Sequence, residues 1–275
     1  MKKLSSLFVL LLSFTLLLAG CGTNDNKENA ADKDNKAETA EGDLLSKIKD
    51  EGKILIGTEG TYPPFTFHDD NGTLTGFDVE IATEVAKRLG VKPEFKETQW
   101  DAMFAGLDAK RFDMIANQVG IRPDRQEKYD FSSPYITSKA VLITHKDNKD
   151  IKDFEDIKGK KSAQSLTSNY GDMAKSLGAE LVGVEGFNQS VELLSSKRVE
   201  ATINDNLTYL DYKKKKPDAP IKEVAVHEDA SQSGLMFRKG SDELVEAVNK
   251  ALAEMIDDGT YLKISEKWFG EDVLK

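Results

Sequence analysis

Short apolar runs alternate with helix-length amphipathic segments between Leu44 and Lys275, and this rhythm favours an α/β architecture. Buried strands are predicted around Phe95 and at residues 53–57, 112–116, 162–164, 181–184 and 201–203. Helices are predicted at residues 77–89, 100–107, 170–177, 188–196 and 243–257, and a short one starts at Leu45. Glycines 52, 90 and 259 are expected to end three of these helices.

The α/β rhythm occurs twice, and extended runs at residues 140–144 and 233–237 separate the two occurrences. We expect these runs to carry the chain from one α/β unit to the other and back. The sequence therefore predicts two lobes, one formed by residues 44–138 plus 233–275 and the other by residues 139–232. In such a protein, ligand sites are expected at the carboxyl ends of strands that face the cleft.

The first 20 residues have the layout of a secretory signal, with Lys2 and Lys3 before an apolar run from Leu7 to Leu18. The run is shorter than the ~20 apolar residues that span a bilayer, so a permanent membrane helix is the weaker interpretation. Residues 18–21, Leu-Ala-Gly-Cys, resemble the lipobox of bacterial lipoproteins. The resemblance implies a cut before Cys21 and a lipid on its thiol, with a buried free cysteine as the alternative.

Residues 22–43 contain no Leu, Ile, Val, Phe, Tyr, Trp or Met. A segment with nothing to bury cannot offset the entropy of folding. We therefore predict that residues 21–43 form a disordered tether between the lipid and the folded part.

Charge and cysteine content exclude several functions. The chain has 38 Lys plus Arg against 48 Asp plus Glu, a net charge of −10, which opposes binding to nucleic acid. With one cysteine, it can form neither an internal disulfide nor a zinc site of paired cysteines. We expect no metal and no cofactor.

Polar and aromatic residues gather directly after the predicted strands. Prolines 63 and 64 fix the backbone between two aromatic residues, Tyr62 and Phe65, which could stack on a ligand or, for Phe65, belong to the core. The other candidates follow later strands and are Asn117, Gln118, Val119, Gly120, Arg125, Ser165, Thr167, Ser168, Asn169, Tyr170 and Asp205.

Three of these features fit a zwitterionic amino acid. Arg125 offers a planar fork for a carboxylate, although a loop arginine is more often solvated or paired with a surface acid. Ser168 and Asn169 open a helix whose N-terminus favours an anion, or they simply cap it. Asp205 could accept hydrogen bonds from an ammonium group.

The chain resembles the extracellular solute-binding proteins of family 3, the polar amino acid receptors of ABC importers, over residues 44–275. The matching segments are Gly57-Thr58-Glu59, Tyr62-Pro63-Pro64-Phe65, residues 74–80, Trp100-Asp101-Ala102-Met103, Arg111-Phe112-Asp113, Arg125 with residues 129–135, and residues 156–160, 257–261 and 267–270. This resemblance implies a type II periplasmic-binding-protein fold, in which each lobe is a mixed sheet flanked by helices and two extended crossovers join the lobes.

The resemblance also assigns roles. It implies that Arg125 binds the ligand carboxylate, that Tyr62 stacks on the ligand, and that Trp100 lines the same wall. Many members have small hydroxyl residues where this chain has residues 117–120, so the ligand amine must rely on Asp205 and backbone carbonyls. Residues 168–170 match the loop that closes on the carboxylate, and Leu166-Thr167 replaces its usual Gly-Thr.

Residues 97–101, 117–119 and 163–170 are similar to the cystine-binding lipoproteins of Gram-positive bacteria. We therefore predict an L-cystine receptor on the outer face of the cell membrane, a monomer that is lipid-anchored through Cys21 and serves an ABC permease and its ATPase. One end of cystine would meet Arg125 and Asp205, and the other Asn117, Gln118 or Tyr170.

The alternatives are a receptor for arginine, glutamine or histidine, and an enzyme on the same fold resembling cyclohexadienyl dehydratases. Catalysis is the weaker interpretation, because the three histidines are scattered and no Gly-x-Ser-x-Gly segment occurs. Asp69 and Asp70 lie in a predicted turn and lack the remaining ligands of a calcium loop.

Overall fold

The structure is a computed structural model that describes residues 43–275. The predicted signal at residues 1–20, Cys21 and all of the predicted tether except Asp43 lie outside the described residues. Asp43 caps the first helix, since its carboxylate accepts hydrogen bonds from the backbone N–H groups of Leu45 and Ser46. Among residues 43–275, no helix is long and apolar enough to cross a membrane.

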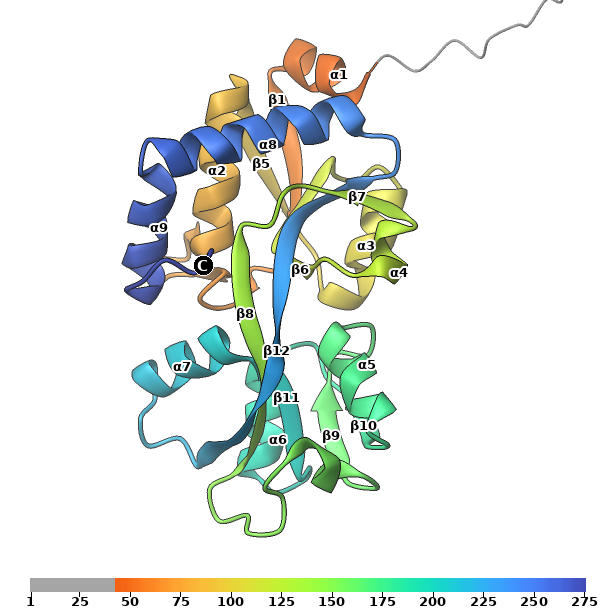
Figure 1. Cartoon of the computed structure of the whole chain (residues 1–275), viewed down its shortest axis with the longest axis vertical. Helices are drawn as coiled ribbons and strands as arrows, with labels where there is room; N and C mark the ends of the chain where they lie inside the picture. The colour runs from red at the N-terminus through yellow and green to blue at the C-terminus, as the bar shows by residue number, and fades with distance from the viewer. Residues whose placement is uncertain (1–42) are drawn as a thin grey trace, which may run out of the picture. The chain divides into compact units, whose positions relative to one another are not determined.

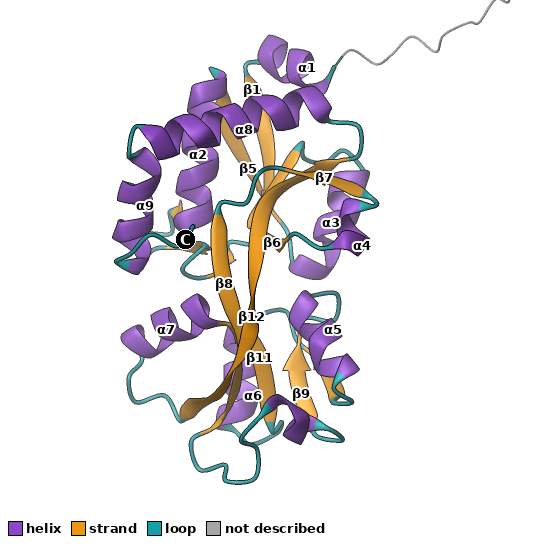
Figure 2. Cartoon of the chain, in the orientation of Figure 1, coloured by secondary structure: helices purple, strands orange, loops and turns teal. Residues whose placement is uncertain are grey.

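Helices and strands alternate along the chain, which confirms the predicted α/β class (Figure 2). The helices are α1 (Leu44–Glu51), α2 (Phe77–Leu89), α3 (Trp100–Asp108), α4 (Pro123–Gln126), the 3₁₀ helix η1 (Phe154–Ile157), α5 (Asn169–Ser176), α6 (Phe187–Ser195), α7 (Asn206–Lys215), α8 (Asp242–Asp257) and α9 (Thr260–Phe269). The strands are β1 (Lys53–Thr58), β2 (Thr61–Tyr62), β3 (Thr66–His68), β4 (Leu74–Thr75), β5 (Lys92–Glu97), β6 (Met114–Gly120), β7 (Tyr129–Phe131), β8 (Ile136–His145), β9 (Lys161–Gln164), β10 (Glu180–Gly183), β11 (Ala201–Asp205) and β12 (Ile221–Arg238).

One sheet of nine strands runs through the described residues in the order β10-β9-β11-β8-β12-β6-β1-β5, with β7 also paired to β12. Strands β1, β5 and β6 are parallel at one end of this order, and β9, β10 and β11 are parallel at the other. The long strands β8 and β12 pair antiparallel with each other and link the two ends (Figure 1). Strands β2, β3 and β4 form a separate small sheet.

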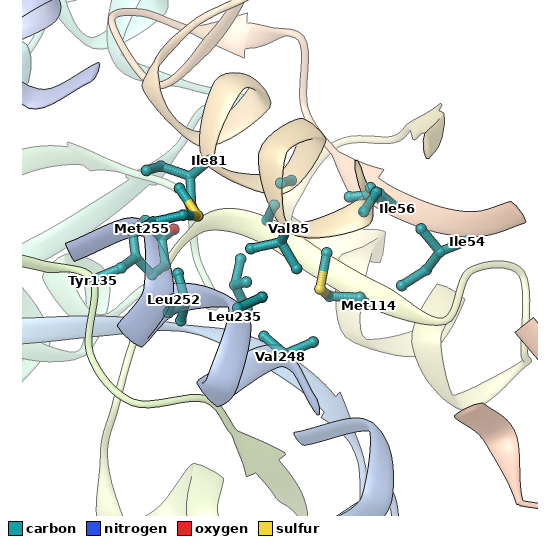
Figure 3. Packing of buried hydrophobic residues seen from close by; sticks show 14 of the residues in the cluster. Ile54, Ile56, Ile81, Val85, Met114, Tyr135, Leu235, Val248, Leu252 and Met255 are labelled. Atoms are coloured by element: carbon teal, nitrogen blue, oxygen red, sulfur yellow. The ribbon is translucent and has the colours of Figure 1, made fainter. Parts of the chain in front are cut away.

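Separate hydrophobic cores form around the two ends of the large sheet. We call α1 to β7 together with α8 and α9 the first half, and η1 to α7 the second half. In the first half, α2 and α8 pack Ile81, Val85 and Leu252 against strand residues such as Ile56 and Leu235 (Figure 3). The second half has cores of its own, built from β9, β11 and helices α5 and α6.

The sequence locates most elements, and the three helix-ending glycines are confirmed by their left-handed backbone. Three helices, α4, α7 and α9, were not predicted. For α7, the four consecutive lysines at residues 213–216 obscure the pattern. The predicted extended run at residues 233–237 is only the last part of β12, which spans 18 residues. Its earlier part is mostly half-exposed and polar, so it lacks the apolar signal of a buried strand.

Candidate functional site

A cavity lies between the two halves, at the ends of strands where small-molecule sites are expected. Both halves line it, through the ends of β1, β6, β9 and β11 and the starts of α3, α5 and α6. The lining residues are Glu59, Tyr62, Trp100, Asn117, Gln118, Gln164, Ser165, Ser168, Asn169, Tyr170, Gly186, Phe187, Ser190 and Asn204. No group of three or more His, Cys, Asp or Glu residues that could hold a metal ion occurs in residues 43–275.

The structure brings together most of the residues singled out in the sequence. The predicted residues that line the cavity are Tyr62, Trp100, Asn117, Gln118, Ser165, Ser168, Asn169 and Tyr170. They come from segments far apart in the sequence. The rule that ligands sit at strand ends selected all of them except Trp100, which the family resemblance supplied.

Other predicted residues lie elsewhere. Phe65 and Val119 are fully buried in the cores of the first half, and the ring of Phe65 packs against that of Phe269. Thr167 is exposed and donates its hydroxyl to the Asp101 carboxylate at 2.6 Å, across the cleft between the halves. Gly120 does not line the cavity, and its carbonyl accepts a hydrogen bond from Arg125.

Arg125 does not line the cavity itself but lies next to Trp100, which does. It is 5% exposed, and its guanidinium carbon is 5.6 Å from the centre of the Trp100 ring and 5.2 Å from that of Phe104. Its Nη1 donates to the Gly120 carbonyl at 3.1 Å, and no carboxylate of the described residues forms an ion pair with it. Burial lowers the pKa of Arg125 to about 10, so the group still carries its charge at neutral pH.

Asp205 is fully buried at the end of β11 and does not line the cavity. Its Oδ2 accepts hydrogen bonds from Ser138 Oγ at 2.5 Å, Gln118 Nε2 at 2.7 Å and Tyr170 Oη at 3.0 Å. Its Oδ1 accepts from the Leu207 N–H and thereby caps α7. These donors occupy the carboxylate that the sequence led us to assign to the ligand amine.

Glu59 is a cavity residue that the sequence reasoning passed over. It directly follows β1, and its Oε2 accepts a hydrogen bond from Asn117 Nδ2 at 2.6 Å while its own N–H donates to Asn117 Oδ1 at 2.8 Å. Burial raises the pKa of Glu59 to about 7. The strand-end position was a usable signal, because the same rule had picked out Tyr62 three residues later.

The remaining residues that were missed come from the second half and are Gln164, Gly186, Phe187, Ser190 and Asn204. Phe187 and Ser190 belong to the first turn of α6, and both are buried. Asn204 precedes Asp205 and accepts a hydrogen bond from Tyr62 Oη at 2.9 Å.

Hydrogen bonds cross the cleft on several sides of the cavity. Two of these hydrogen bonds, from Tyr62 to Asn204 and from Thr167 to Asp101, are described above. In a third, Arg122 Nη1 donates to Asp172 Oδ2 at 2.8 Å. The structure thus has the two halves in direct contact around the cavity.

Comparison with known proteins identifies relatives of this arrangement. Residues 54–271 match the model of bacterial extracellular solute-binding proteins, family 3. The L-cystine-binding protein TcyA of Bacillus subtilis (strain 168) is 52% identical over 276 residues, which cover 100% of this chain and 99% of the relative. The L-cystine-binding protein TcyJ of Escherichia coli (strain K12) is 43% identical over 238 residues, which cover 84% of this chain and 88% of the relative.

Solved structures have the same fold. An ancestral arginine-binding protein bound to glutamine gives a TM-score of 0.77 at 40% identity, covering 80% of this chain and 99% of that one. The L-cystine solute receptor of Neisseria gonorrhoeae in the unliganded open conformation gives a TM-score of 0.57 at 52% identity. This match covers 84% of this chain and 99% of that one.

The fold is therefore the type II periplasmic-binding-protein fold that the family resemblance implied. The family match also decides between receptor and enzyme. The chain belongs to the bacterial extracellular solute-binding proteins, family 3, and is a binding protein rather than an enzyme.

Proposed function

We propose that this protein captures L-cystine in the cavity between its two halves and delivers it to an ABC importer. The observation that carries this proposal is the composition of the cavity wall. Rings of Tyr62, Trp100 and Phe187 share the wall with hydrogen-bonding groups from both halves. Cystine is two amino acids joined by a disulfide, and sulfur makes favourable contacts with aromatic rings. Two relatives that bind L-cystine by name support the choice.

The polar groups suggest how the two zwitterionic ends are held. Glu59 supplies the acidic acceptor for one ammonium group, and Arg125 supplies a charge without an acidic partner for one carboxylate. The Asn169 amide at the start of α5 is a donor for the other carboxylate, whereas the Ser168 hydroxyl donates to the Ser165 carbonyl and caps the helix.

A ligand panel tests the assignment. Calorimetry with L-cystine, L-arginine, L-glutamine, L-histidine and L-cysteine should give the tightest binding for cystine. We expect cysteine to bind at least about 30-fold more weakly, because it leaves one set of polar groups unpaired, at a cost of ~2 kcal/mol. Tight binding of arginine, glutamine or histidine with no binding of cystine would refute the cystine assignment.

We further propose that residues 44–138 plus 233–275 and residues 139–232 move as two lobes about β8 and β12. The bonds across the cleft fit a closed state. The higher TM-score with a ligand-bound protein of 40% identity than with an unliganded open protein of 52% identity also favours closure. Closure would present both lobes, as a monomer, to the permease and its ATPase.

Membership of an extracellular family places the protein outside the cytoplasm. We propose that a lipid on Cys21 anchors it to the outer face of the membrane, with residues 21–43 as the tether. Metabolic labelling with radioactive palmitate should label the wild type and leave Cys21→Ser unlabelled. Equal labelling of both proteins would overturn this proposal.

A further inference from the structure

One contact across the cleft joins two residues that adjoin the cavity but do not line it. Asp101 follows Trp100 in the first turn of α3, and Thr167 precedes Ser168 in the loop before α5. The Thr167 hydroxyl donates to Asp101 Oδ1 at 2.6 Å, and the Thr167 backbone N–H donates to the same oxygen at 3.2 Å. Because Asp101 and Thr167 are exposed while their neighbours line the cavity, this contact lies between the cavity and solvent.

The loop that carries Thr167 is held in place within its own half. Ser168 donates its N–H and its hydroxyl to the Ser165 carbonyl, at 3.1 and 2.8 Å, and its Oγ also caps α5. The side chain of Leu166 lies over Gly183, the last residue of β10, where a Cβ would come within 3.2 Å of it. Thr167 therefore presents its hydroxyl and N–H to the first half from a turn that α5 and β10 fix.

Asp101 offers an acceptor that suits these donors. It lies in the first turn of α3, where the helix dipole favours negative charge, and the N-cap residue Gln99 forms no side-chain capping bond. Hydrogen bonds to an ionised carboxylate are stronger than those between neutral groups. Among the described residues, both donors to the Asp101 carboxylate are groups of Thr167. The hydrogen bonding of this carboxylate therefore depends on contact between the halves.

We propose that the hydrogen bonds between Asp101 and Thr167 form a latch, which holds the two halves together at the edge of the occupied cavity and slows the escape of the ligand. This inference rests on the proposed capture of a ligand between two moving lobes. Asp101 belongs to the first lobe and Thr167 to the second, so both bonds break when the lobes part. The latch therefore forms after the ligand has entered, and Thr167 acts on closure without touching the ligand.

Removing the latch should raise the rate constant of dissociation. Thr167→Val keeps the shape of the side chain and removes one of the two bonds, so L-cystine should dissociate about three- to tenfold faster. Asp101→Ala removes both bonds and should speed dissociation about ten- to thirtyfold. Neither variant should lower the rate constant of association, because the ligand enters while the lobes are apart. A distorted cavity would instead slow association.

Stopped-flow measurements on the full chain separate the two rate constants, with the fluorescence of Trp100 at the cavity wall as the signal. They are made at pH 8, where Glu59, whose pKa is about 7, is largely ionised. Thr73→Val, in the exposed turn between β3 and β4, is the matched control for the loss of a threonine hydroxyl. Its rate constant of dissociation should equal that of the wild type.

Conservative variants distinguish the latch from a general structural role. Thr167→Ser retains the hydroxyl and the N–H, and Asp101→Asn retains an oxygen that can accept both bonds. Each should release L-cystine within about threefold of the wild-type rate. Thermal unfolding of the ligand-free protein shows whether each variant is folded, and Thr167→Ala replaces Thr167→Val if the valine variant does not fold.

A double-mutant cycle decides whether the two residues act as one unit. Because Asp101→Ala already removes both bonds, adding Thr167→Val to it should change the rate constant of dissociation less than about twofold. Effects that multiply would mean that each residue acts on the ligand separately. Wild-type dissociation from both single variants would mean that the contact does not hold the lobes together. Either result overturns the inference.

The outcome is separable from the cystine assignment, because the latch lies outside the cavity and does not depend on which amino acid the lobes enclose. If L-arginine, L-glutamine or L-histidine binds instead of L-cystine, the same cycle is run with that amino acid. The cystine assignment then fails, while the dissociation rates of the variants still confirm or refute the latch.

Discussion

Arg125→Ala is expected to weaken L-cystine binding by at least about 100-fold. The guanidinium is buried against Trp100 and Phe104 and has no acidic partner among the described residues. A ligand carboxylate that loses such a partner is left desolvated and unpaired, which costs ~3–5 kcal/mol. Calorimetric titration with L-cystine, together with thermal unfolding of the ligand-free protein, measures the effect.

Arg122→Ala is the matched control. Arg122 is three residues away and already bonds to the carboxylates of Asp124 and Asp172, so its charge is not free for a ligand. Removing this partly exposed group should change the affinity for L-cystine less than about tenfold, because only its ion pair with Asp172 across the cleft is lost. Arg125→Lys keeps the charge without the planar fork, so its affinity for L-cystine should lie between those of the wild type and Arg125→Ala. Wild-type affinity in Arg125→Ala would show that the ligand carboxylate is held elsewhere.

The sequence predicted the fold well because the pattern and the packing agree. The apolar stripe of residues 77–89 becomes the buried face of α2, and residues 53–57 become the buried strand β1. Prediction failed where burial did not decide the structure. Helix α7 forms although its polar residues show little periodicity, since Asp205 caps it and Leu207 anchors it in a core.

The candidate site could be predicted only in part, for a physical reason. The rule that ligands bind at strand ends finds the segments around Tyr62, Asn117 and Tyr170, because it depends on topology alone. It cannot say which side chain of a segment faces the cavity. Asp205 and Glu59 both end strands, yet four hydrogen bonds enclose the carboxylate of Asp205, while Glu59 stays open to the cavity. That difference depends on partners distant in sequence.

Glu59→Gln should remove most of the pH dependence of ligand binding. Burial raises the pKa of Glu59 to about 7, and only the ionised form pairs with an ammonium group. For the wild type we expect affinity for L-cystine to fall about 25-fold from pH 7.5 to pH 5.5, as the carboxylate takes up a proton. Glu59→Gln should bind about 30-fold more weakly at pH 7.5, from the loss of ~2 kcal/mol, and nearly as well as wild type at pH 5.5.

The stability of the ligand-free protein provides an independent check with a definite sign. The pKa of Glu59 is raised on folding, so its contribution to stability is full below about pH 4.5 and is lost as the pH rises through about 7. Glu59→Gln has no ionisable group at this position and does not lose this stability. The difference in melting temperature, variant minus wild type, should therefore increase from pH 5 to pH 8. Asp70→Asn, in the exposed turn between β3 and β4, is the control and should keep the wild-type pH profile. An unchanged pH profile in Glu59→Gln would mean that another acid receives the ligand ammonium.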